Sequence, residues 1–116
     1  MLVAIAIPIF TSQLEKSREA TDEANIRSLY AETTAAVLSE DTSATTTIKD
    51  AILTVAKGTD GVYTGTATYT CQQQKAGLEN DEDVNIGGVT VDKSKFGPSA
   101  TITIVIKSDG SAPTIS

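Results

Sequence analysis

The first 40 residues constrain the fold most, because they form one continuous helix-forming stretch whose character changes along its length. Residues 2–10, LVAIAIPIF, are apolar, whereas residues 11–39 are polar and charged with spaced apolar positions. A helix that is apolar all round must be covered by lipid or protein, whereas a helix with one apolar stripe lies on the surface of a globular domain. We therefore predict one long helix over residues 1–39, apolar over 2–10 and amphipathic over 11–39.

Pro8 interrupts the apolar run without excluding a helix. Inside a helix in water, a proline costs roughly 3 kcal/mol or more, because it removes a backbone donor and clashes with the carbonyl four residues back. Here the proline falls within the first turns, where the clash is largely avoided, and membrane helices also tolerate proline. The run is shorter than the about 20 apolar residues that a bilayer requires. We therefore expect it to be the second half of a longer apolar segment.

The amphipathic half of the predicted helix carries a clear apolar stripe. Five residues recur at helical spacing and form this stripe, which we expect to pack on a sheet: Ile26, Leu29, Tyr30, Thr33 and Val37. The other faces hold charged residues that we expect to be solvated: Glu15, Lys16, Arg18, Glu19, Asp22, Glu23, Arg27 and Glu32. Opposite charges four residues apart, such as Glu23 and Arg27, favour the helix.

After the helix, residues 39–47 read SEDTSATTT, and such side chains compete with helix by bonding their own backbone. Thr47, followed three residues later by Asp50, is typical of the N-terminal cap of a helix. The apolar residues Ile48, Ile52 and Val55 then recur at helical spacing. We predict a short second helix over about residues 48–56. A buried β-strand over residues 51–56 is the alternative.

Three later segments favour β-strands. Residues 62–71, VYTGTATYTC, alternate in character, and one face is expected to lie against the helix: Tyr63, Gly65, Ala67, Tyr69 and Cys71. Residues 84–91, VNIGGVTV, predict a second strand with Gly87 and Gly88 as a turn or bulge. Residues 100–107, ATITIVIK, are the clearest strand. A turn and an extended tail are expected to end the chain.

The predicted fold is therefore a single α+β domain. Its long N-terminal helix packs on a small antiparallel sheet of three to four strands, in a globular head over residues 40–116. Net charge is −6 and the lysines and arginines are scattered, so direct nucleic-acid binding is not expected. The chain has no histidine, which excludes Ser-His and Cys-His nucleophile pairs and histidine-based zinc sites. We expect neither an enzyme nor a cofactor.

Two further features invite a functional interpretation. Cys71 is the only cysteine, and we interpret it as a small buried residue rather than a reactive thiol or an intermolecular bridge. An oxygen-rich run spans residues 79–85, ENDEDVN, and Ca²⁺ prefers about six to eight oxygen ligands. The run lacks EF-hand spacing, so we favour a solvated loop. A calcium site involving Glu79, Asp81 and Asp83 is the alternative.

The N-terminal region carries a family resemblance. AIAIPIF, followed by a polar helix that ends in Leu29, Tyr30, Ala31, Ala35 and Ala36, resembles the start of type IV pilins and the related pseudopilins. The resemblance covers about residues 2–40. The family's leader, processing site and early glutamate do not occur in this sequence, so the resemblance implies an N-terminally truncated chain. Gram-positive pilins, which often lack the disulfide of Gram-negative ones, are the closer comparison for a chain with one cysteine.

The resemblance implies a structural role. Seven residues would form the membrane-held segment and then the filament core: Ala4, Ile5, Ala6, Ile7, Pro8, Ile9 and Phe10. The implied partners are other pilin subunits, the prepilin peptidase, the assembly machinery and, before assembly, the cytoplasmic membrane. The implied location is a surface filament serving adhesion, motility or DNA uptake, and the charged helix faces are either solvated or in contact with other subunits. The alternatives are a pseudopilin of a type II secretion or competence system and, outside the family, an extracellular binding module.

Overall fold

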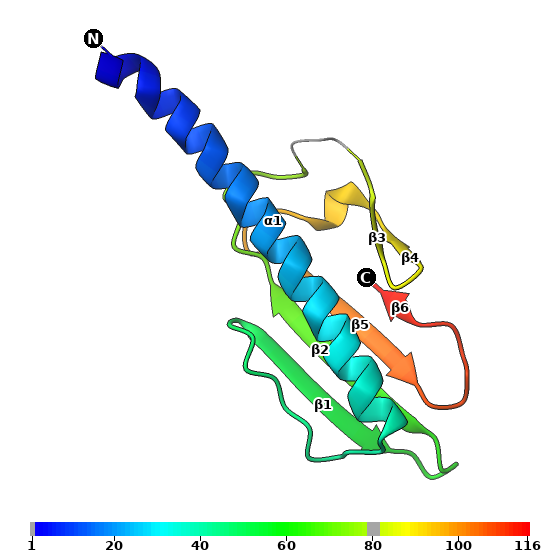
Figure 1. The fold of residues 1–116 in the computed structure, drawn as a ribbon. Coiled ribbons are helices and arrows are strands. Elements are labelled where there is room, and N and C mark those ends of the chain that lie inside the picture. Colours follow the sequence, from blue (N-terminus) through cyan, green and yellow to red (C-terminus); the bar gives the residue numbers. More distant parts are fainter. Residues whose placement is uncertain (1, 79–81) are drawn as a thin grey trace.

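The computed structural model describes residues 2–78 and 82–116, with side chains described from Gln13 onward within those ranges. One helix, α1 (Leu2–Leu38), lies across one face of a four-stranded antiparallel sheet (Figure 1). A separate two-stranded sheet stands beside α1. The chain is therefore α+β with one long N-terminal helix.

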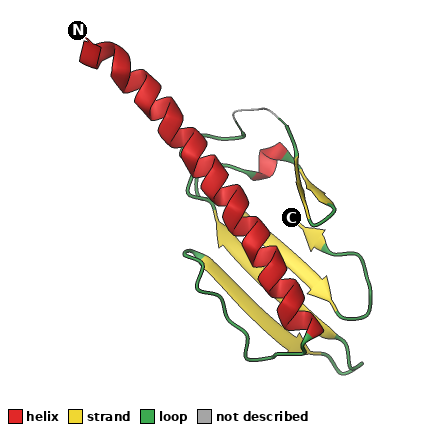
Figure 2. Cartoon of the chain, in the orientation of Figure 1, coloured by secondary structure: helices red, strands yellow, loops and turns green. Residues whose placement is uncertain are grey.

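The main sheet has the strand order β1-β2-β5-β6, and each neighbouring pair is antiparallel (Figure 2). Its strands are β1 (Ala51–Lys57), β2 (Tyr63–Thr70), β5 (Thr101–Lys107) and β6 (Thr114–Ile115). The second sheet pairs β3 (Val84–Ile86) with β4 (Val89–Val91), and a short 3-10 helix, η1 (Lys93–Lys95), follows it. The strands predicted over residues 62–71 and 100–107 are confirmed as β2 and β5.

The short helix predicted over residues 48–56 is wrong, and the alternative strand is correct. β1 pairs with β2 along its whole length, from Ala51 opposite Tyr69 to Lys57 opposite Tyr63. Leu53 and Val55 are 4% and 5% exposed whereas Ile52 is 67% exposed, which is the two-residue period of a strand. Pairing with β2 thus decides the conformation of this segment, although Thr47 and Asp50 resemble a helix N-terminal cap.

In the segment VNIGGVTV, the turn predicted at Gly87 and Gly88 is confirmed, and it divides the predicted strand into two short strands. Gly87 and Gly88 both have positive φ angles, +58° and +86°, so the chain reverses there and forms the β3–β4 hairpin. The tail predicted to be extended pairs partly with β5, where Ile104 lies opposite Ile115 in β6.

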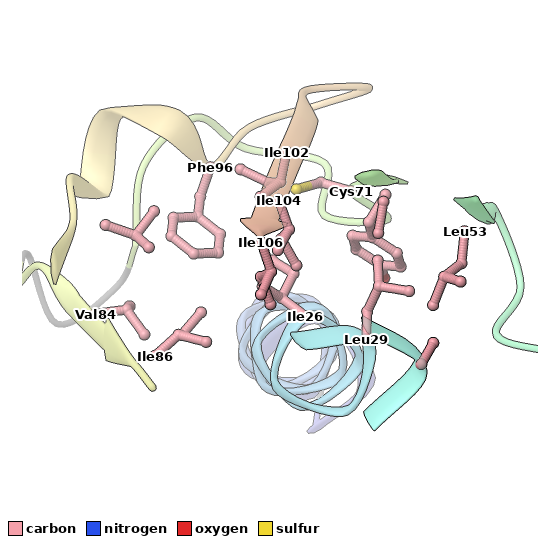
Figure 3. Close-up of a cluster of buried hydrophobic side chains, with 14 of the residues drawn as sticks. Ile26, Leu29, Leu53, Cys71, Val84, Ile86, Phe96, Ile102, Ile104 and Ile106 are labelled. Atoms are coloured by element: carbon pink, nitrogen blue, oxygen red, sulfur yellow. The ribbon is translucent and has the colours of Figure 1, made fainter. Parts of the chain in front are cut away.

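The core lies between α1 and the main sheet and continues under the hairpin (Figure 3). From α1 it includes Ile26, Leu29 and Val37, and from the sheet it includes Leu53, Val55, Ala67, Tyr69, Ile102, Ile104 and Ile106. Val84, Ile86, Val91 and Phe96 close it on the hairpin side. The predicted inner face of β2 is confirmed for four of its five residues, because Gly65, Ala67, Tyr69 and Cys71 are buried while Tyr63 is half-buried.

Gly65 lets α1 approach β2 closely. A Cβ atom at this position would lie 2.5 Å from Cγ2 of Val37 and 2.8 Å from Cγ2 of Thr33. Both distances are below van der Waals contact, so any larger residue would push the helix away from the sheet. The small residue predicted on this face of β2 therefore sets the spacing between the two layers.

The loop between α1 and β1, residues 39–50, is attached to the core and to α1. Ala44 and Ile48 of the loop pack against the core, and the Thr46 hydroxyl donates a hydrogen bond of 2.6 Å to the Glu32 carboxylate. These contacts fix the loop on the head.

The turn that follows α1 contains a residue in a strained backbone conformation. The Glu40 N–H donates to the Val37 carbonyl at 3.1 Å, and the Asp41 N–H donates to the Ala36 carbonyl at 3.0 Å. These two bonds form a Schellman motif, whose turn residue adopts a left-handed conformation and is usually glycine. Glu40 occupies that position with φ of +57°.

Replacing this residue, Glu40→Gly, is expected to stabilise the chain by up to about 1 kcal/mol, because glycine adopts the left-handed conformation without steric cost. Urea denaturation followed by circular dichroism measures the change. Ser39→Gly is the matched control and is expected to destabilise the chain, since Ser39 has no positive φ angle. Glycine there adds flexibility to the unfolded chain and removes the hydrogen bonds from the Ser39 hydroxyl to the Ala35 and Ala36 carbonyls. A Glu40→Gly chain less stable than the wild type would contradict the assignment.

Candidate functional site

The N-terminal part of α1 extends beyond the sheet (Figure 1). A helix of 37 residues is about 55 Å long at about 1.5 Å per residue, and the longest axis of the molecule is 66 Å against 25 and 18 Å for the others. The seven residues predicted to form a filament core lie in this extending part, and Pro8 does not end the helix. Their side chains lie outside the described set.

Among the described residues, no helix combines the length and the apolar character needed to cross a membrane.

The predicted apolar stripe lies mostly between α1 and the sheet. Ile26, Leu29, Thr33 and Val37 are completely or almost completely buried, and the Thr33 hydroxyl donates to the Leu29 carbonyl at 2.6 Å. Tyr30 is placed differently, at the side of the helix facing the hairpin. Its hydroxyl donates to the Gly87 carbonyl at 3.4 Å, and a Cβ atom at Gly87 would lie only 2.3 Å from the tyrosine ring.

Three acidic residues predicted to be solvated are instead buried, so that prediction is wrong for them. Glu15, Glu19 and Asp22 are 2%, 7% and 0% exposed. They extend the buried stripe toward the N-terminus, because the positions 15, 19, 22, 26, 29, 33 and 37 follow one another at intervals of three or four residues. The inward face of α1 therefore begins with carboxylates and continues with apolar side chains.

Asp22 binds the chain where it leaves β2. Its carboxylate accepts hydrogen bonds from the Tyr69 hydroxyl at 2.6 Å, from the Gln72 N–H at 2.8 Å and from the Gln73 N–H at 3.1 Å. A buried carboxylate is costly unless donors surround it, and these three donors offset much of that cost.

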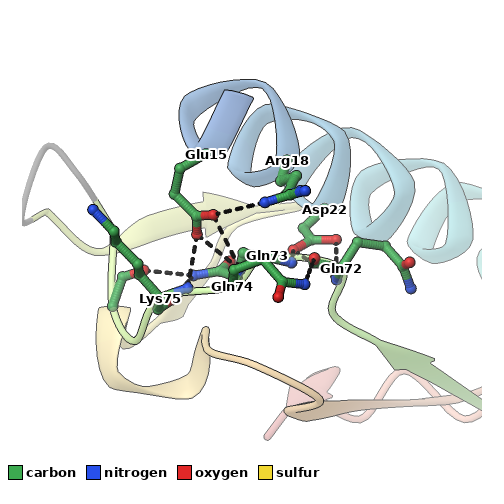
Figure 4. A network of polar contacts seen from close by, with 8 residues as sticks. Glu15, Arg18, Asp22, Gln72, Gln73, Gln74 and Lys75 are labelled. Carbon is green, nitrogen blue, oxygen red and sulfur yellow. Dashed lines mark hydrogen bonds and ion pairs between the residues drawn. The ribbon is translucent and has the colours of Figure 1, made fainter. Parts of the chain in front are cut away.

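Glu15 binds the next two residues of the same segment (Figure 4). One carboxylate oxygen accepts from the Gln74 N–H at 3.0 Å and from the Lys75 N–H at 2.9 Å. Arg18 Nη1 lies 3.6 Å from the other oxygen. Four consecutive backbone N–H groups, from residues 72–75, thus donate to two carboxylates that stand two helical turns apart. We call this arrangement the carboxylate clamp.

The clamp provides hydrogen-bond acceptors for backbone N–H groups that have none in the sheet. Residues 72–75 have left the sheet, so their N–H groups lack ladder partners, and a buried unpaired N–H costs about 1–3 kcal/mol. Gln73 is 1% exposed, and its side-chain amide holds the following turn by donating to the carbonyls of Lys75 at 2.9 Å and Gly77 at 2.6 Å. This polar segment is therefore a fixed part of the head.

The clamp also affects its neighbours. Burial, reinforced by the hydrogen bond to Asp22, raises the pKa of Tyr69 far above its ordinary value of 10.0. Burial, reinforced by the Asp22 charge, raises the pKa of the Cys71 thiol from 9.0 to about 11. Cys71 is 4% exposed, as predicted for a buried residue, and at neutral pH it is a thiol with little nucleophilic character.

We expect Cys71 to react slowly with a thiol reagent at pH 8 in the folded chain. A pKa of about 11 in place of 9.0 lowers the thiolate fraction about a hundredfold at that pH, and burial further restricts access. The rate of reaction with a chromogenic disulfide reagent, compared in buffer and in concentrated urea, measures the effect. Equal rates in the two solvents would contradict the placement of this side chain.

Of the three predicted calcium ligands, only Asp83 lies within the described residues. Glu79 and Asp81 lie outside the described residues. The Asp83 carboxylate accepts a hydrogen bond of 2.9 Å from the Lys93 N–H. Across residues 2–78 and 82–116, no group of three or more His, Cys, Asp or Glu side chains is placed to hold a metal ion.

Comparisons of the chain with protein-family models, with curated proteins and with solved structures gave no match. The clamp attaches α1 to the head, because the carboxylate oxygens of Glu15 and Asp22 accept hydrogen bonds from backbone N–H groups of the head. The clamp fastens α1 to the head close to where the helix leaves it.

Proposed function

We propose that this chain is a structural subunit, a pilin, of a type IV pilus and assembles through its N-terminal helix into a surface filament. The observation that carries the proposal is the division of α1 into two parts. From Glu15 onward the helix has one buried stripe against the head, whereas its apolar N-terminal part extends beyond the sheet. Leu14, at the boundary, is 39% exposed, so the head does not cover the helix face that it occupies.

An apolar helix that extends from a domain needs another cover. Each large aliphatic or aromatic side chain removed from water contributes about 1.5–3 kcal/mol, and residues 2–10 include six of them, Leu2, Val3, Ile5, Ile7, Ile9 and Phe10. Lipid would provide the cover before assembly, and the helices of neighbouring subunits would provide it in the filament. The same segment would then serve in the cytoplasmic membrane and at the cell surface.

This proposal gives the carboxylate clamp a mechanical role. In a filament held together by helices, force on the head reaches the rest of the assembly through α1. The head must therefore stay attached to the helix close to the point where the helix enters the filament core. Glu15 and Asp22 provide that attachment with hydrogen bonds to charged acceptors, which are about twice as strong as neutral ones.

The variant Ile7→Asp tests the proposal in the cells that make the protein. A charge in this segment costs about 2.5–3.5 kcal/mol at the centre of a membrane helix and opposes burial in a helix bundle. We expect normal amounts of folded head and no surface filaments, as seen by immunoblotting and by electron microscopy with an antibody to residues 40–116.

The control is Lys57→Asp, which changes an exposed residue at the end of β1, on the head. It is expected to leave the filaments intact. Normal filaments from Ile7→Asp would contradict the filament-core assignment. Loss of filaments from both variants would show that the assay does not distinguish changes in the helix from changes in the head.

A further inference from the structure

We draw no further inference here: the strongest candidate, the stripe of small exposed side chains along the outer face of α1 formed by Ser17, Thr21, Ala24, Ser28, Ala31 and Ala35, carries nothing because nothing in the structure shows what covers it.

Discussion

Leu29→Asp is expected to unfold the head. Leu29 is completely buried between α1 and the sheet. Losing a buried leucine side chain costs about 2–5 kcal/mol, and a buried carboxylate without donors adds several kcal/mol more. The sum is comparable with the whole stability of a small domain, about 5–15 kcal/mol. Far-UV circular dichroism and a thermal melt would show the loss of a cooperative transition.

The adjacent variant Ser28→Asp provides the control, because Ser28 lies on the same helical turn and is exposed. It adds the same charge and changes helix propensity little, so its melting temperature should remain within a few degrees of the wild type. If Leu29→Asp melted like Ser28→Asp, the packing of α1 on the sheet would be wrong.

Asp22→Ala should destabilise the chain by about 3 kcal/mol or more. The substitution leaves the Tyr69 hydroxyl and the N–H groups of Gln72 and Gln73 without their acceptor, and each unsatisfied buried donor costs about 1–3 kcal/mol. Urea denaturation measures the loss. Hydrogen exchange resolves where it occurs, since the amides of Gln72 and Gln73 should lose protection before those in the centre of β2.

Glu23→Ala is the matched control for this prediction. Glu23 is the next acidic residue along α1, is only half-buried and takes no part in the clamp. Its replacement should change the free energy of unfolding by no more than about 0.5 kcal/mol. Equal losses from the two variants, or undiminished protection of the Gln72 amide in Asp22→Ala, would show that Asp22 does not hold this segment.

The elements predictable from the sequence were those with a strong local pattern. Residues 101–107 alternate isoleucine with threonine or valine, and this period identifies β5 without knowledge of its neighbours. The long helix is similarly evident from its composition. In β1, by contrast, Ile52 and Val55 fit helical spacing as well as a strand, and only the ladder to β2 decides between them. This partner follows β1 directly, across the turn at residues 58–62, but the spacing of apolar residues within 51–57 does not show the pairing.

The carboxylate clamp was missed for a related reason. Glu15, Glu19 and Asp22 continue the spacing of the buried stripe, and that regularity was a usable signal. Acidic side chains are seldom fully buried unless donors compensate them, so their type argued against an inward position. The compensating N–H groups lie 50 to 60 residues further along the chain. The helical spacing of a buried stripe should therefore be extended to charged residues when another segment of the chain has backbone N–H groups without hydrogen-bond partners.

The resemblance to pilins and the arrangement of α1 support the same role by separate routes. The resemblance rests on the sequence of residues 2–40 alone. The structural argument rests on which part of α1 is buried against the head. Residues 40–116 contribute the surface that would face outward, on a sheet whose open face is rich in threonine at alternate positions of β2. A pseudopilin would share this design and differ in the length of the assembly that it forms.

The most direct test of the proposed role is to shear surface filaments from the cells that make this protein and to identify their main component. Mass spectrometry of the sheared material, with immunogold labelling against residues 40–116, gives the measurement. The proposal predicts surface filaments that are labelled and contain this chain, and labelling along their whole length would identify it as the main subunit. A chain that remains in the membrane, with no labelled filament at the surface, would contradict the role as a filament subunit and would favour a pseudopilin.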